Sequence, residues 1–177
     1  MATSYALRLF CNLSCSIFLA SIISRSWNVI ADSGLVDKVY KQASDYKFCN
    51  DALNSDPRTP GADEITLAYV AFGLAYRKAS STQLQITSLL NNSTSPVHEH
   101  LEQCHGDYVT AIAKIQEALT DLDSETYDGL AGLASKAGDR AVDCESAFNR
   151  TKSPLTDNNR DLKGLSEICV AVAHLFS

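Results

Sequence analysis

Four long stretches of the chain place apolar or small residues at alternating steps of three and four positions. This is the period of an α-helix that packs one face into a bundle. The stretches cover 65–90, 97–122, 127–148 and 162–176. In the first stretch the expected core positions are Ile65, Tyr69, Phe72, Tyr76, Ala79, Gln83, Ile86 and Leu90. The pattern predicts an all-α protein with four long helices.

Short polar breaks separate the four stretches, and they contain Asn, Ser, Asp and Pro. The breaks fall at 91–96, 123–125 and 151–154. Such short connections favour neighbouring helices that run in opposite directions, so we expect an up-down-up-down four-helix bundle over about 62–177.

A shorter unit precedes the bundle. Residues 35–43 and 46–53 are each about two helical turns long, and they join around Ser44 and Asp45. Pro57 closes the unit, because proline cannot continue a helix and restricts the residue before it. We expect a short N-terminal helical hairpin over about 34–54.

The N-terminal segment has the layout of a secretory signal peptide. Arg8 precedes an apolar run over 9–23 that is too short to span a bilayer, and no acidic residue occurs before Asp32. We expect cleavage after Ala31, which assigns 1–31 to the signal peptide and 32–177 to a single domain. An uncleaved membrane anchor is disfavoured, because no cluster of basic residues follows the run as a cytoplasmic flank.

The charge balance argues against a nucleic-acid-binding protein. The full chain has 15 basic and 21 acidic residues, a net charge of −6 and a pI near 5.1. Affinity for nucleic acids comes mainly from neutralised phosphates, which requires the opposite charge. Loss of Arg8 and Arg25 with the signal peptide would leave 13 basic residues and a net charge of −8. We expect neither nucleic acid nor, after cleavage, a membrane among the partners.

Four cysteines remain in 32–177, namely Cys49, Cys104, Cys144 and Cys169. Export to an oxidising compartment predicts disulfide formation. Two residues of an antiparallel helix pair lie level when their numbers average to the turn, and Cys104 and Cys144 average to 124, inside the predicted break. We expect this pair to form a disulfide that closes a 41-residue loop. Cys49 and Cys169 would then be either free or paired with each other.

The densest group of possible metal ligands lies in 98–105, where His98, Glu102 and His105 would share one helical face. A solvated helix surface is the favoured interpretation, because Cys104 is better used in the disulfide and no HExxH motif is present. The sequence also lacks a nucleophile elbow, a phosphate-binding glycine loop and a catalytic cysteine context. His174 is interpreted as a helix-terminal residue rather than a base. We therefore expect a binding protein rather than an enzyme, with no metal and no cofactor.

Asparagines in three N-x-Ser/Thr sequons are candidates for N-glycosylation. Asn91 and Asn92 begin overlapping sequons in 91–94, and Asn149 begins a third in 149–151.

Several motifs resemble one family in the same order along the chain. They are DYKFC at 45–49, ALNSDPR at 52–58, LEQC at 101–104 followed by Tyr108, DCESAF at 143–148, SPLT at 153–156 and LSEIC at 165–169. The sequence is similar to the plant invertase and pectin methylesterase inhibitor family, and within it to the pollen-allergen type described as "putative invertase inhibitors". The resemblance implies a four-helix bundle preceded by a helical hairpin. It also implies a protein of the apoplast, cell wall or vacuole that binds reversibly and stoichiometrically over the active-site cleft of a carbohydrate enzyme.

Two departures from the family pattern affect the interpretation. The family usually closes its hairpin with a disulfide, but Tyr40 stands where the first cysteine is expected, so Cys49 lacks its usual partner. Cell-wall invertase inhibitors can carry a Pro-Lys-Phe element at the turn into the third helix, where this chain has ETY at 125–127. The resemblance therefore favours pectin methylesterase as the target, with acid invertase as the alternative.

An alternative of another class is a secreted helical binding protein without inhibitory activity. For an inhibitor, the candidate partner-binding residues are Tyr127, as an aromatic anchor, with Glu117 and Asp121 as steering carboxylates.

Overall fold

The computed structural model describes residues 33–149 and 151–177, and in this part of the chain all regular structure is helical. The predicted signal peptide, with its cleavage site after Ala31, lies outside the described residues. Helices α2 (Ser33–Gln42) and α3 (Tyr46–Asn54) form the predicted hairpin. The bundle consists of α4 (Glu64–Leu90), α5 (Val97–Asp123), α6 (Leu130–Ala147) and α7 (Thr156–Ala173), and the short 3-10 helix η1 (His174–Phe176) follows α7.

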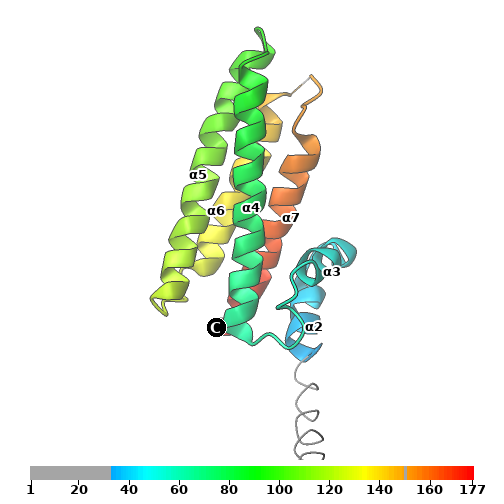
Figure 1. The fold of residues 1–177 in the computed structure, drawn as a ribbon, viewed down its shortest axis with the longest axis vertical. Coiled ribbons are helices and arrows are strands. Elements are labelled where there is room, and N and C mark those ends of the chain that lie inside the picture. Colours follow the sequence, from blue (N-terminus) through cyan, green and yellow to red (C-terminus); the bar gives the residue numbers. More distant parts are fainter. Residues whose placement is uncertain (1–32, 150) are drawn as a thin grey trace, which may run out of the picture. The chain divides into compact units, whose positions relative to one another are not determined.

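The four bundle helices alternate in direction, as Figure 1 shows, so the predicted up-down-up-down arrangement is confirmed. The connections after α4 and after α6 lie at one end of the bundle. The connection between α5 and α6 lies at the other end, together with the C-terminus. The α5–α6 connection and the C-terminus can therefore contribute to one surface.

Side-chain caps define where two of the helices begin. Asp45 accepts a hydrogen bond from the Phe48 backbone N–H at 2.9 Å at the start of α3. Asp63 does the same for the Thr66 backbone N–H at 2.7 Å at the start of α4. These bonds satisfy N–H groups that have no partner within the helix. The bonds from Thr66 also lower the pKa of the Asp63 carboxyl.

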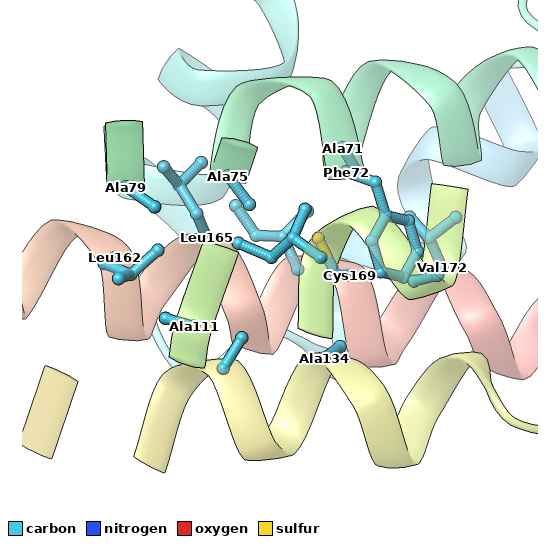
Figure 2. Packing of buried hydrophobic residues seen from close by; sticks show 14 of the residues in the cluster. Ala71, Phe72, Ala75, Ala79, Ala111, Ala134, Leu162, Leu165, Cys169 and Val172 are labelled. Carbon is cyan, nitrogen blue, oxygen red and sulfur yellow. The ribbon is translucent and has the colours of Figure 1, made fainter. Parts of the chain in front are cut away.

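The core is formed by side chains from all four bundle helices, some of which Figure 2 displays. In the second, third and fourth stretches the residues that recur at steps of three and four are largely buried, as the spacing predicts. Their buried positions include Leu101, Cys104, Tyr108, Ala111, Ile115, Leu122, Leu130, Ala134, Ala137, Ala141, Cys144, Phe148, Leu162, Leu165, Cys169 and Val172.

The face predicted for α4 is confirmed at Phe72, Ala79 and Ile86, which are buried, but it is too narrow. Ile65 is exposed, and Tyr69, Tyr76 and Gln83 are only half-buried. The buried side chains instead form a wider arc, which consists of Leu67, Ala68, Val70, Ala71, Phe72, Ala75, Ala79, Thr82 and Ile86. The reason is that α4 packs against α5, α7 and the hairpin helix α3, so it buries more than the single stripe of a bundle helix.

The connection between α5 and α6 is longer than the predicted break at 123–125. It spans 124–129, because α6 begins only at Leu130. Glu125 adopts a positive φ of 54°, and the Thr126 backbone N–H donates to the Asp121 carbonyl at 2.8 Å. The chain therefore reverses tightly at the end of α5 and leaves Tyr127 in the connection rather than in a helix.

The predicted disulfide is confirmed. Cys104 of α5 and Cys144 of α6 are bonded, with their Cα atoms 4.5 Å apart. Cys49 and Cys169 do not form a pair and are buried free thiols. Burial raises the pKa of the Cys49 thiol to about 12, and it raises the pKa of the Cys169 thiol as well.

The hairpin is held by packing where the family pattern would have a disulfide. Tyr40 is buried, its hydroxyl accepts a hydrogen bond from the Asn54 side-chain amide at 2.9 Å, and its ring meets Tyr46 edge-on. Phe48 of α3 lies directly over Gly164 of α7, where a Cβ atom would stand 2.7 Å from the ring. The hairpin therefore docks on α7 through a contact that requires a glycine.

Candidate partner-binding site

Tyr127 lies in the connection between α5 and α6, beside the end of the chain. Its ring stacks on that of Phe176 in η1, with centroids 4.5 Å apart and planes inclined by 15°. Both rings are half-buried and pack against the core. Stacking of this kind holds an aromatic side chain in place while one part of it stays accessible.

A small hollow of about 150 Å³ lies beside this aromatic pair. Residues from the connection, from α6 and from the end of α7 and η1 form its walls, namely Tyr127, Asp128, Ala131, Ala173, His174, Phe176 and Ser177. The hollow is large enough for a side chain of a partner rather than for a drug-sized ligand, whose pockets are about 300–1,000 Å³.

Carboxylates gather around the same connection. Glu117, Asp121, Asp123, Glu125 and Asp128 all occur in 117–128, and no Lys or Arg occurs between 115 and 135. Tyr69 of α4 donates a hydrogen bond to the Asp123 carboxylate at 2.6 Å, and this bond raises the pKa of the Tyr69 hydroxyl. The resulting negative potential would attract a basic partner.

Two of the three predicted partner-binding residues come together here. Tyr127 directly follows Thr126, whose backbone N–H donates to the Asp121 carbonyl, so both predicted residues belong to the same turn. Glu117 lies one turn earlier on α5 and is engaged by Lys114 at 2.6 Å. We name Tyr127, Phe176, Asp121, Asp123 and Asp128 the turn surface.

Three members of the turn surface were not among the predicted partner-binding residues: the carboxylates Asp123 and Asp128, and the aromatic residue Phe176. The place of Phe176 in the fourth helical stretch indicated a core residue, whereas the helix ends at Ala173 and η1 turns the ring onto Tyr127. The sequence did not indicate this contact, because it depends on the end of α7 at Ala173 and on the direction that η1 then takes.

The histidines of 98–105 are arranged as ordinary helix side chains. The His98 Nε2 atom is 3.6 Å from Glu102, its Nδ1 atom is 3.1 Å from the Ser93 hydroxyl, and His100 packs against Phe148. Within the described residues, no three His, Cys, Asp or Glu side chains are grouped to hold a metal ion. His174 is exposed at the C-terminal cap of α7, with its Nδ1 atom 3.4 Å from the Gln42 side-chain oxygen.

A second hollow of about 380 Å³ lies between α6, α7 and the turn of the hairpin. The Glu167 carboxylate in its lining already accepts hydrogen bonds from the Ser44 hydroxyl and the Lys163 ammonium group. The Ser166 hydroxyl in its lining is buried and has no hydrogen-bond partner among the described residues. The turn surface offers more free charge and more accessible aromatic area than this groove.

An ion pair with a buried carboxylate and a partly exposed guanidinium joins α5 and α6. Asp107 of α5 is buried, one of its oxygens is 3.6 Å from Arg140 of α6, and the other has no hydrogen-bond partner within the described residues. Burial raises the pKa of this carboxyl, although Arg140 acts in the opposite direction. Arg140 is itself shared with Asp143 at 2.7 Å. This group contributes to the α5–α6 interface rather than to the turn surface.

The plant invertase/pectin methylesterase inhibitor family model matches residues 35–172. The chain belongs to this family. The family is one of enzyme inhibitors, as its name states, and the match covers both the hairpin and the bundle of this inhibitor-family protein.

Relatives of this inhibitor-family protein carry both names. The "Putative invertase inhibitor" of Platanus orientalis is 33% identical over 134 residues, covering 73% of this chain and 79% of the relative. The "Pectinesterase inhibitor" of Actinidia deliciosa is 32% identical over 172 residues, covering 96% and 92%. The "Cell wall / vacuolar inhibitor of fructosidase 2" of Arabidopsis thaliana is 30% identical over 178 residues, covering 98% and 96%.

A solved structure supports the fold. The crystal structure of a mutant form of a pectin methylesterase inhibitor from Arabidopsis matches with a TM-score of 0.74 at 22% identity, covering 81% of this chain and 97% of that chain. The hairpin-plus-bundle architecture of this inhibitor-family protein is therefore that of its family. None of the helices in 33–149 and 151–177 is long and apolar enough to cross a membrane.

Proposed function

We propose that this protein inhibits a plant cell-wall carbohydrate enzyme, pectin methylesterase in the first place, by reversible one-to-one binding over its active-site cleft. The observation that carries the proposal is the family match over residues 35–172, supported by relatives that are named as inhibitors over nearly the full length of the chain. On this proposal the protein performs no chemistry of its own and acts by covering the target.

The turn surface supplies the contact in this proposal. The stacked rings of Tyr127 and Phe176 form an apolar anchor, and aromatic anchors dominate the binding energy of many interfaces. The carboxylates around them steer a basic enzyme toward this end of the bundle and fix its orientation. Because exposed ion pairs contribute only about 0.2–1 kcal/mol each, the charge should act mainly on the association rate.

Acid invertase is the alternative target. It is favoured by the 33% identity to the relative named "Putative invertase inhibitor", and it is disfavoured by the ETY sequence at 125–127. A helical binding protein without inhibitory activity remains the alternative of another class.

The proposal places the mature protein in the cell wall or apoplast, or in the vacuole. It takes residues 1–31 as a signal peptide that is removed after Ala31 and residues 32–177 as the inhibitor domain. The relative from Arabidopsis thaliana named as a cell wall / vacuolar inhibitor is consistent with either destination.

The test is a titration of purified pectin methylesterase and of purified acid invertase with the secreted protein. We expect saturable loss of pectin methylesterase activity that reaches its limit at one inhibitor per enzyme. Loss of invertase activity alone would support the alternative target. Binding without inhibition of either enzyme would support the third class.

A matched pair of variants tests the turn surface. Tyr127→Ala should raise the inhibition constant by at least about tenfold, the effect expected of a hot-spot residue. Leu84→Ala is the control, because Leu84 is a 73% exposed apolar residue on α4, away from the turn. Both variants should keep the parent's far-ultraviolet circular dichroism. If Tyr127→Ala inhibits as well as Leu84→Ala, the binding face is elsewhere.

A further inference from the structure

The connection between α4 and α5 carries two overlapping sequons that the proposed function does not use. Asn91 precedes Asn92 and Ser93 in one, and Asn92 precedes Ser93 and Thr94 in the other. Both asparagines are exposed in the folded protein. Exposure is required, since a glycan is large and hydrophilic and belongs on a surface loop.

The contacts of Asn92 suit a glycan. Its side-chain nitrogen donates one hydrogen bond, to the Ser88 carbonyl on the last turn of α4, at 3.0 Å. A side-chain amide has two N–H donors, and a glycan replaces only one of them. The other can keep the bond to Ser88, so the modified side chain would stay anchored on the end of α4.

Asn91 is placed differently. It forms the C-cap of α4, and its backbone N–H donates to carbonyls of that helix. The Ser93 hydroxyl of its sequon donates to the Leu90 carbonyl at 3.3 Å and contacts His98. Asn92 follows this cap, and Thr94, the hydroxyl residue of its sequon, is exposed.

The sequon loop lies far from the turn surface. Helix α5 runs between them and contains 27 residues, which corresponds to a length of about 40 Å. Figure 1 shows the α4–α5 connection at the top of the bundle and the C-terminus at the bottom. A glycan in the loop would therefore cover one end of the bundle and leave the other end free.

We propose that Asn92 is an N-glycosylation site and that its glycan covers the end of the bundle opposite the turn surface, which confines the target enzyme to the other end. In the modification, the Asn92 side-chain nitrogen forms a bond to C1 of a sugar, the bond from C1 to the diphosphate of a glycosyl diphosphate donor breaks, and the amide loses one proton. The second part of the proposal rests on the proposed inhibitory function.

The first measurement is independent of inhibition. The full chain is secreted from a eukaryotic host, and its peptides are mapped after treatment with peptide N-glycosidase, which leaves an aspartate at the modified position. We expect the aspartate at position 92. Unmodified peptide over 91–94, or an aspartate at position 91, would overturn the assignment.

Two variants separate the overlapping sequons without touching either asparagine. Ser93→Ala destroys only the sequon of Asn91, and Thr94→Ala destroys only that of Asn92. We expect the glycan at position 92 to persist in Ser93→Ala and to be lost in Thr94→Ala. Loss in Ser93→Ala alone would overturn the proposal. Asn149 lies in a separate tryptic peptide, so its occupancy does not affect the result.

The second measurement compares inhibition by the glycosylated and the enzymatically deglycosylated protein. We expect inhibition constants that agree within about twofold, because the target does not approach the glycan. A change of about tenfold or more would overturn the placement of the glycan away from the target. If neither form inhibits, the proposed function fails, while the peptide map still decides whether Asn92 is modified.

Discussion

Replacement of Gly164 by alanine tests how the hairpin is held on the bundle. Gly164 lies inside α7, where alanine is favoured over glycine by about 0.5–1 kcal/mol in the free energy of unfolding. A Cβ atom at this position would stand 2.7 Å from one ring carbon of Phe48 and 3.0 Å from the next. Real Cβ atoms do not approach so closely, so the Phe48 ring must shift from its present contact with α7.

The two effects have opposite signs, and their sizes decide the outcome. Inserting a methyl group into a packed contact costs about 1–3 kcal/mol. After the gain in helix propensity, Gly164→Ala should lower the free energy of unfolding by about 1 kcal/mol. Gly106→Ala is the matched control, because Gly106 lies inside α5 with nothing within 4 Å of its would-be Cβ. It should raise the free energy of unfolding by about 0.5–1 kcal/mol.

Urea unfolding followed by circular dichroism measures both values. A double variant completes the test: in a Phe48→Ala background, Gly164→Ala should become stabilising, as Gly106→Ala is, because the obstructing ring is gone. If Gly164→Ala already stabilises the parent as much as Gly106→Ala does, the Phe48 ring moves aside without a cost in stability. The argument that Phe48 docks the hairpin on α7 would then be refuted.

Three further predictions concern the covalent structure and the ionisation of the core. Reduction of the Cys104–Cys144 disulfide, or its replacement by two alanines, should lower the free energy of unfolding by about 4 kcal/mol, and an unchanged urea midpoint would contradict this. Cys49 and Cys169 should not react with a thiol reagent in the native protein and should react on unfolding, since both are buried. Burial raises the pKa of the Asp107 carboxyl. The protonation of this carboxyl therefore adds to the free energy of unfolding below the ordinary aspartate pKa, and this addition is lost as pH rises through the pKa of the folded state. Asp107→Asn should therefore be more stable than the parent at pH 7, and the difference in urea midpoint should vanish near pH 3. A variant that is less stable at pH 7 would show that the attraction between Asp107 and Arg140 exceeds the cost of burying the carboxylate.

The disulfide and the bundle were predictable because both follow from local periodicity. A helix in a bundle buries one stripe, and the stripes of α5, α6 and α7 recur in the sequence with the expected spacing. Once those helices and the turn between the first two are known, antiparallel packing brings Cys104 level with Cys144. The α5–α6 connection is longer than predicted, at 124–129, and Cys104 and Cys144 are nonetheless bonded.

The face of α4, the docking of the hairpin and the composition of the turn surface were decided only by tertiary structure. Periodicity within one helix does not report how many neighbours cover it, so the wide buried arc of α4 could not be read from its own sequence. The contact of Phe48 with Gly164 and the stack of Tyr127 on Phe176 join residues far apart in the chain. Local propensity determines which segments are helical and where each turns, whereas contacts between distant segments depend on how the helices pack together, and no single segment encodes that packing.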